Sequence, residues 1–267
     1  FSSVLEPYAV KVASTVLRGG CHCEVMFLPD YIKEKVHILM EQIYIIGDVH
    51  GCYKSLLALI EQFPNKQNSK IVFVGDLIDR GINSYEVIEF VKNNNYDCVM
   101  GSHEKALLQY SEFGVSEDLK KWYEKGGGKE TINSYSSKEK FNEHIEYLKS
   151  LPLYLEYQDY RTADNRYIVV SHSAVADSWN LRLSLSVEDK QIFEQYCLYK
   201  RYKKFDNKDI FNIYGHAVRS EVKLTSFDCN VDLGCCYKGS DDAVPSPRLC
   251  ALEFPSTKIF IQKNIED

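Results

Sequence analysis

The chain has 267 residues, of which 45% are hydrophobic and 26% charged, so it can bury a substantial core and falls within the range of one large domain. Its net charge of −6 argues against a nucleic-acid partner, because proteins that bind nucleic acid usually carry clustered basic residues. The sequence has no stretch approaching the roughly 18 consecutive apolar residues that a membrane-spanning helix needs. These features predict a folded protein that binds neither nucleic acid nor membranes.

Nine cysteines, an odd number, are scattered along the chain, without an apolar signal region and a small-residue cleavage site. We interpret them as reduced thiols of a cytoplasmic protein. The pairs Cys21/Cys23 and Cys235/Cys236 lack the four-ligand spacing typical of zinc sites, so we expect ordinary thiols there.

The first 39 residues show no repeated helical or strand pattern, and Met40 stands just ahead of the first apolar run. We expect residues 1–39 to form an N-terminal extension of uncertain order, with Met40 or Met26 as a candidate natural start. An alternative is that residues 31–39 form a short helix packed on the body. Residues 40–267 are expected to form a single domain.

From residue 43 onward, apolar runs alternate with helical patterns. The runs at 43–46, 71–74 and 98–100 have the composition of strands buried on both faces. Between them, apolar residues recur at helical spacing within 56–63 and 87–91. This alternation predicts right-handed parallel crossovers, which bring the residues after each strand to one edge of the sheet.

Two helical segments, 105–125 and 142–150, are interrupted by the glycines at 126–128 and a serine-rich turn, and we interpret this block as a cap or side insertion. The remaining elements follow in chain order: a strand at 167–170, a helix at 187–198, a strand at 210–214, and a closing hairpin of 249–254 with 259–262.

Four short strings place carboxylate and imidazole groups directly after apolar runs. They are GDVHG at 47–51, GDLIDR at 75–80, GSHE at 101–104 and GH at 215–216. Borderline divalent ions need oxygen and nitrogen ligands, and two ions about 3.5–4 Å apart need a bridging carboxylate, an arrangement suited to in-line attack on phosphorus. The strings therefore predict a dinuclear metal site, with Asp76 as the candidate bridge.

These strings resemble the motifs GDxHG, GDxxDRG and GNHE of the calcineurin-like metallophosphoesterases, specifically their phosphoprotein phosphatase branch. The first two motifs are complete, whereas Ser102 stands where the family has Asn. The strings VSH at 170–172 and YGH at 214–216 resemble the two later histidine motifs. The resemblance covers residues 43–260 and implies an α/β fold of two mixed β-sheets packed face to face with flanking helices, a four-layer metallophosphoesterase domain.

The resemblance also implies which side chains hold the two divalent ions. Mn²⁺ is the first candidate, and Fe or Zn suits the same donors. The implied ligands of the first ion are Asp48, His50, Asp76 and His216, and those of the second are Asp76, Ser102 and His172.

His103 is a better candidate for general acid than for ligand, because a leaving alkoxide needs a proton in the transition state. Asp79 would orient its ring, although Asp79 could instead simply pair with Arg80. Arg80 and Arg201 would hold phosphate oxygens, because a guanidinium stays charged and can grip two oxygens. For Arg201, a solvated basic run at 200–204 is an equal alternative.

The remaining histidines and two acidic residues receive no chemical role. We expect His22, His37 and His144 to be solvated, and Glu104 and Asp232 either to be structural or to lie just behind the metal ligands and support them.

The implied mechanism is direct attack of a metal-bound hydroxide on phosphorus, without a phosphoenzyme. Our main interpretation is a serine/threonine protein phosphatase of the compact bacterial or phage type, acting on phosphorylated proteins or small phosphoesters. One alternative is a symmetrical dinucleoside tetraphosphate hydrolase, which shares the same metal site. A second alternative, which Ser102 keeps open, is a degenerate member that binds phosphorylated partners with weak or no turnover.

Overall fold

The computed structural model describes residues 42–114, 116–201, 207–237, 244 and 246–266. The predictions for residues 1–39, including His22 and His37, lie outside this part of the chain, so the extension and the boundary at Met40 stay predictions. Among the described residues, no helix is long and apolar enough to cross a membrane.

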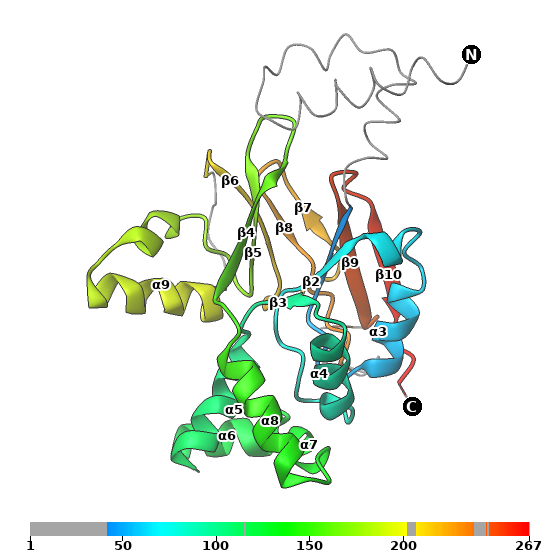
Figure 1. The fold of residues 1–267 in the computed structure, drawn as a ribbon, viewed down its shortest axis with the longest axis vertical. Helices are drawn as coiled ribbons and strands as arrows, with labels where there is room; N and C mark the ends of the chain where they lie inside the picture. The colour runs from blue at the N-terminus through cyan, green and yellow to red at the C-terminus, as the bar shows by residue number, and fades with distance from the viewer. Residues whose placement is uncertain (1–41, 115, 202–206, 238–243, 245, 267) are drawn as a thin grey trace. The chain divides into compact units, whose positions relative to one another are not determined.

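Two five-stranded mixed sheets form the centre of the described domain (Figure 1). The first sheet has the order β10-β9-β1-β2-β3 and the second has the order β4-β5-β6-β8-β7. Strands β1, β2 and β3 are parallel, as are β5, β6 and β8. The first sheet contains β1 (Ile43–Ile46), β2 (Lys70–Phe73), β3 (Asp97–Cys98), β9 (Arg248–Phe254) and β10 (Ile259–Lys263). The second contains β4 (Tyr154–Arg161), β5 (Tyr167–Ser171), β6 (Ile210–Tyr214), β7 (Lys223–Leu224) and β8 (Asp228–Asn230).

The strand β1 shows how the layers are held together. Successive side chains of a strand point to opposite faces. Ile43 and Ile45 therefore pack in the core between the sheets, which Ile168 of the second sheet joins. Tyr44 instead packs on the opposite face with the two helices α3 (Tyr53–Ile60) and α4 (Ser84–Asn93). The predicted fold class, two mixed sheets packed face to face with flanking helices, is confirmed.

The outer face of the second sheet is covered by α9 (Val187–Tyr199), which follows the short 3₁₀ helix η3 (Trp179–Leu183) (Figure 1). Phe193 of α9 packs with Val169 and Tyr214 of the sheet in a separate apolar cluster. Helices thus cover both outer faces, and the inner strands β1, β2, β5 and β6 are almost entirely buried, as the apolar runs predict.

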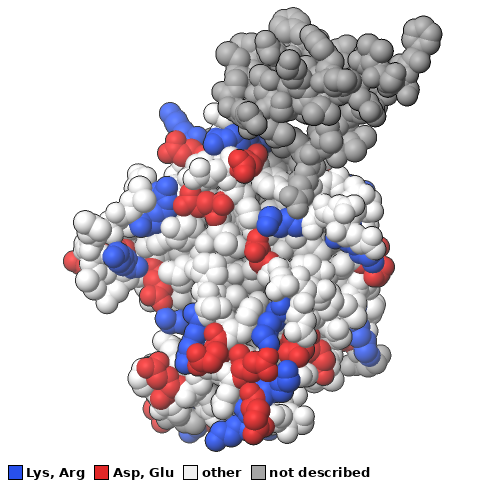
Figure 2. All heavy atoms as spheres, in the orientation of Figure 1, with Lys and Arg blue, Asp and Glu red and all other residues white. Residues whose placement is uncertain are grey.

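A block of four helices lies between β3 and β4 in the sequence: α5 (Ser102–Phe113), α6 (Glu117–Lys125), α7 (Gly128–Asn133) and α8 (Lys138–Lys149). The single helix predicted at 105–125 divides at Gly114, whereas the predicted break at 126–128 is present. Figure 2 shows acidic and basic side chains intermixed over this block, consistent with the ion pair of Lys140 with Glu89 and that of Lys92 with Glu143.

Strands β4, β7 and β8 have no counterpart among the predicted elements. Strand β4 lies at a sheet edge and half of it is polar (YLEYQDYR), so its apolar pattern is weak. Strands β7 and β8 have only two and three residues, too few to show any period.

The prediction that His144 is solvated is wrong, because its side chain is fully buried between α4 and the helical block. His144 Nε2 lies 2.7 Å from Glu89 Oε2, and Nδ1 lies 2.9 Å from the Tyr135 hydroxyl. One ring nitrogen donates to the carboxylate and the other accepts from the phenol, which satisfies a neutral imidazole. Burial lowers the pKa of His144 despite the opposing effect of Glu89.

We therefore expect His144 to make folding sensitive to acid. Its pKa is lower in the folded than in the unfolded chain, so its contribution to stability is present above the unfolded value of about 6.5 and is lost as the pH falls through the folded value, by at most about 1.4 kcal/mol per pH unit. The Tm of the parent should fall more steeply than that of His144→Gln between neutral and mildly acidic pH. Parallel Tm curves would contradict this expectation.

The seven described cysteines are free thiols, and six of them are buried. Cys21 and Cys23 lie outside the described residues. Cys235 belongs to the apolar core against which Cys236 packs, and the Cys236 sulfur also accepts a hydrogen bond of 3.5 Å from the Arg80 guanidinium.

Candidate active site

The predicted ligands converge because they follow the carboxyl ends of parallel strands. Asp48 and His50 follow β1, and Asp76 follows β2 in the same sheet. His172 and His216 follow β5 and β6, which are parallel neighbours in the second sheet. Topology therefore brings five side chains from both sheets to one place, as expected for this kind of strand arrangement.

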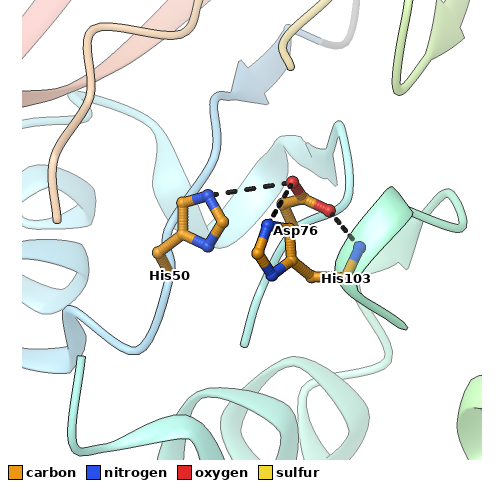
Figure 3. Close-up of side chains that lie close together, drawn as sticks. All are labelled: His50, Asp76 and His103. Carbon is orange, nitrogen blue, oxygen red and sulfur yellow. Dashed lines mark hydrogen bonds and ion pairs between the residues drawn. The ribbon is translucent and has the colours of Figure 1, made fainter. Parts of the chain in front are cut away.

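Asp76 lies at the centre of this cluster and is 2% exposed. Its Oδ2 atom lies 3.3 Å from His172 Nε2, 3.7 Å from His50 Nε2 and 3.9 Å from His103 Nε2. Figure 3 shows the rings of His50 and His103 directed towards this carboxylate. The hydroxyl of Ser102 lies 3.3 Å from the same oxygen. Asp76 thus has the position that a bridging carboxylate requires.

The potential ligand atoms form two sets that share Asp76. One set is His50, Asp76 and His103, and the other is Asp76, His172 and His216; within each set the ligand atoms lie within 4.8 Å of one another. Two sets of nitrogen and oxygen donors joined by a carboxylate fit a pair of borderline divalent ions. The chain's own residues therefore fit the two predicted ions.

The predicted grouping of His216 with Asp48 and His50 needs correction. Its Nδ1 atom lies 3.1 Å from His172 Nε2, so its ring belongs with the second set. The sequence could not show this, because strand order alone does not determine which way a side chain turns after the strand ends.

Two rings are held in the tautomer that a metal needs. His50 Nδ1 lies 2.8 Å from the carbonyl oxygen of Ile78, and His172 Nδ1 lies 2.9 Å from that of Val74. Each Nδ1–H donates to a main-chain carbonyl, which directs the Nε2 lone pair into the site.

The protonation states of His50, His216 and Asp76 favour metal binding. Burial is the main reason why the pKa of His50 lies well below its usual value and that of His216 falls to about 3, so both rings are neutral. Burial alone would raise the pKa of Asp76, but His172 and His103 outweigh it and hold this pKa well below its usual value. A charged carboxylate and neutral imidazoles are the forms that bind metal ions.

Asp48 is buried beside two other carboxyl groups. Burial, followed by repulsion from Asp232 and Asp76, raises the pKa of Asp48 well above its usual value. A divalent cation would remove this penalty, which is a second sign that the residues fit metal ions. The Asp48 carboxylate packs directly against Gly215. A Cβ atom on residue 215 would lie 2.0 Å from Asp48 Oδ1, so only glycine fits at this position.

His103 and Asp79 form a hydrogen-bonded pair beside the ligands. His103 Nδ1 donates to Asp79 Oδ2 at 2.5 Å, and Asp79 is completely buried. Burial lowers the pKa of His103, but the charge of Asp76 and the bond to Asp79 outweigh it and raise this pKa. The geometry suits the predicted acid, although His103 Nε2 also lies within reach of a ligand position.

Arg80 does not simply pair with Asp79, contrary to the alternative interpretation. Its guanidinium lies 2.9 Å from His50 Nε2 and 3.3 Å from His103 Nε2, and its Cζ lies 5.4 Å from the centre of the Tyr237 ring. The Arg80 guanidinium therefore faces the imidazole rings of His50 and His103.

A cavity of about 260 Å³ opens onto these groups. Arg80 and the predicted Arg201 both line it, and Arg201 is at the same time exposed to solvent. Arg219, Asp232 and Tyr237 line it as well. The cavity thus combines metal ligands with cationic side chains from three separate segments.

Glu104 holds the main chain of the bridging residue, in agreement with its predicted structural role. Its carboxylate accepts N–H bonds from Asp76 and Leu77, both at 2.8 Å, and from Gly101 at 3.0 Å. Asp232, which we also expected to be structural, lies in the cavity wall, where burial raises its pKa to about 6.

Several site residues have a left-handed main-chain conformation, which costs free energy for any residue with a side chain. All of these residues lie in the loops that follow β1, β2 and β6. The φ angles are 49° for His50, 48° for Asp76, 75° for Asp79, 67° for Arg80 and 64° for His216.

Four residues at the site were not predicted to contribute. Trp122 and Thr131 contact Asp79, and Arg219 and Tyr237 line the cavity. The triple glycine before Thr131 was a usable signal, because such a run permits close approach of two segments. Arg219 and Tyr237 carried no signal, since single polar residues in loops are common.

The serine at position 102, where the family has Asn, should weaken metal binding. Its short hydroxyl faces Asp76 at 3.3–3.4 Å, and we expect it to reach the second ion poorly or through water. Ser102→Asn should strengthen metal binding by about 10- to 100-fold, the range typical of changes around a metal ligand. Isothermal titration calorimetry and the metal concentration for half-maximal activity would measure this.

The matched control is Ser111→Asn, an exposed position on the same helix α5. This control should titrate as the parent does. If Ser102→Asn also titrates unchanged, Ser102 is already an adequate ligand or does not coordinate at all.

The fold and the shared carboxylate between two donor sets define a metal-dependent phosphoesterase. Residues 42–249 match the family model of the calcineurin-like phosphoesterases, so the chain belongs to this family. Its members are metal-binding hydrolases that use two divalent ions, as the resemblance in the sequence implies.

The relatives differ in how much of the chain they match. "Bis(5'-nucleosyl)-tetraphosphatase PrpE [asymmetrical]" from Oceanobacillus iheyensis is 26% identical over 85% of this chain and 97% of its own length. "Bis(5'-nucleosyl)-tetraphosphatase, symmetrical" from Coxiella burnetii is 34% identical over 53% of this chain, which spans 45% of that relative's length.

Solved structures share the fold. A proposed diadenosine tetraphosphatase superimposes with a TM-score of 0.62 over 85% of this chain and 95% of its own, at 19% identity. A serine/threonine phosphatase from Saccharomyces cerevisiae gives a TM-score of 0.52 over 85% of this chain and 80% of its own, at 16% identity.

Proposed function

We propose that the protein hydrolyses a phosphoanhydride bond of dinucleoside polyphosphates such as diadenosine tetraphosphate. The observation that carries this proposal is the nearly end-to-end similarity to the Oceanobacillus relative, whose name states that activity. The main interpretation from the sequence, a serine/threonine protein phosphatase, has weaker support, because the likeness to such an enzyme concerns the fold alone.

The cationic side chains of the cavity support a substrate with several phosphates. Arg80, Arg201 and Arg219 line the cavity beside the metal ligands. A guanidinium binds phosphate oxygens in pairs, so three of them suit a polyphosphate chain better than a single phosphate.

We assign the metal ligands in two groups that share Asp76, with Asp48 in place of His103 in the first group because His103 is assigned to proton transfer. One ion would be held by Asp48, His50 and Asp76. The other ion would be held by the same Asp76 together with Ser102, His172 and His216. When bound, the ions would neutralise phosphoryl charge and acidify water, and Mn²⁺ is the first candidate, with Fe or Zn suited to the same donors.

The chain's own groups would handle the proton and the substrate. A water oxygen would form the new bond to phosphorus and release a proton to the solvent, while the bond from phosphorus to the bridging oxygen breaks and the leaving phosphate takes the electron pair. His103 presents Nε2 to the cavity because Nδ1 is bonded to Asp79, so Nε2 would give its proton to the leaving oxygen. Arg80 and Arg201 would hold the remaining phosphate oxygens.

Rates on diadenosine tetraphosphate and on a phosphoserine peptide, measured side by side with Mn²⁺, test the proposal. We expect kcat/KM to be at least about tenfold higher for the dinucleotide, a difference of about 1.4 kcal/mol in activation free energy. Anion-exchange chromatography of the products would locate the cleavage, since two ADP indicate symmetrical and AMP with ATP asymmetrical hydrolysis.

The other outcomes correspond to the other interpretations. Faster hydrolysis of the phosphopeptide would establish a protein phosphatase instead. Binding of either compound without products in the presence of Mn²⁺ would indicate a member without turnover.

A further inference from the structure

We infer that Trp122 and Thr131 of the helical block are positioning residues, which fix the carboxylate of Asp79 and through it the ring of His103. This inference goes beyond the proposed function. It rests on phosphoester hydrolysis at this site but not on a dinucleotide substrate.

The contacts surround the carboxylate. Asp79 Oδ2 accepts two hydrogen bonds of 2.5 Å, one from His103 Nδ1 and one from the indole Nε1 of Trp122. Asp79 Oδ1 accepts the third, from the hydroxyl of Thr131, also at 2.5 Å. The N–H of Asp79 lies 2.9 Å from the same Thr131 oxygen and 3.0 Å from the Ser84 oxygen. Asp79 is thus held on both carboxylate oxygens and on its main chain.

Three donors leave the carboxylate a single orientation. A carboxylate accepts at both of its oxygens, and a rotation that improves one of these bonds breaks another. The ring of His103 takes its orientation from this carboxylate, and a displacement of about 1 Å at a reacting group can cost about 100-fold in rate. Trp122 and Thr131 therefore act on the reaction without touching substrate.

The helical block is shaped to bring these donors to Asp79. Helix α6 carries Trp122, helix α7 carries Thr131, and Gly127 separates the helices with a φ of 100°. A Cβ atom on Gly127 would lie 2.1 Å from the main-chain nitrogen of Arg80 and 2.9 Å from the Asp79 side chain. The helical block thus packs directly against the turn that contains Asp79 and Arg80. The sequence predicted only a cap or side insertion, without contact to these residues.

Hydrolysis of two aryl phosphates would separate positioning from simple packing. Phenyl phosphate releases phenol, whose pKa of about 10 makes protonation important, whereas para-nitrophenyl phosphate releases a far more acidic phenol. For Trp122→Phe, which keeps an aromatic ring, and for Thr131→Val, we expect kcat on phenyl phosphate to fall about tenfold, part of the about 10² to 10⁴ that an acid supplies. KM and the rate on para-nitrophenyl phosphate should change little.

Two further variants complete the comparison. Thr131→Ser restores the hydroxyl and should recover most of the rate lost in Thr131→Val. Trp179→Phe is the matched control, because Trp179 is buried and donates to the hydroxyl of Tyr167 in another cluster. Equal losses on both aryl phosphates, or no recovery in Thr131→Ser, would overturn the inference.

A double-mutant cycle tests the route of the effect. In a His103→Asn background, Trp122→Phe should cause no further loss on phenyl phosphate, because the ring that it positions is gone. A loss that simply adds to that of His103→Asn would show that Trp122 acts by another route.

A spectroscopic test needs no substrate and so stands apart from the proposed function. The chain has two tryptophans, so the indole N–H signals in a ¹H–¹⁵N spectrum can be assigned with Trp122→Phe and Trp179→Phe. Asp79→Asn removes the charged acceptor and should move the Trp122 signal upfield while leaving the Trp179 signal in place. An unmoved Trp122 signal would show that the bond to Asp79 is absent in solution.

Discussion

Removal of divalent metal should abolish hydrolysis of para-nitrophenyl phosphate, and added Mn²⁺ should restore it. The reason is that Asp76 lies within 3.9 Å of three imidazole groups, an arrangement that suits borderline divalent ions. The measurement uses an aryl phosphate, so its outcome does not depend on the proposed nucleotide specificity. Activity would be followed during chelation, dialysis and stepwise return of the ion.

Two controls make this result interpretable. Circular dichroism should show that the chelated protein keeps its fold. Asp76→Asn, which removes the shared charged ligand, should stay inactive at any Mn²⁺ concentration. Full activity after exhaustive chelation and metal-free dialysis would disprove the dinuclear site.

His103→Asn should slow hydrolysis of a phosphoserine peptide by about 10² to 10⁴ while affecting para-nitrophenyl phosphate far less. The alkoxide of serine is a poor leaving group that needs a proton, and His103 is bonded to Asp79 in the orientation to supply one. Initial rates of phosphate release from both substrates, measured for the parent and for His103→Asn, would give the two losses in rate.

Asp79→Asn should show the same dependence on the leaving group, because it removes the partner that orients the ring. Equal losses on both substrates would instead indicate that His103 is a metal ligand. In that case His103 would bind a metal ion together with His50 and Asp76, with which it forms one group of potential ligands.

Much of the site could be predicted because its signals are local. A carboxylate or imidazole directly after a buried strand must lie at the sheet edge, and this rule groups Asp48, His50 and Asp76. The family resemblance was needed to place His172 and His216, which follow strands of the second sheet, beside them. The strands themselves are visible in the sequence because full burial demands continuous apolar residues, as in β1 and β2.

What could not be predicted depends on contacts between distant segments. Trp122 lies 43 positions from Asp79 and Thr131 lies 52, and no local pattern joins them. His144 has a polar neighbourhood in the sequence, yet the packing of α8 on α4 buries it against Glu89. The turn of His216 towards His172 likewise depends on the conformation after the strand.

The left-handed turns at the site set a limit on how stable this protein can become. Each such residue can cost about 1–3 kcal/mol, with Asp and His at the lower end because they tolerate this conformation best. Five of them together approach the about 5–15 kcal/mol of net stability that a whole domain usually has. Glycine at any of these positions would relieve the strain and remove a functional group, so stabilising substitutions here trade directly against activity. A programme of thermostabilisation would therefore have to leave these five positions alone and gain its stability in the helical layers.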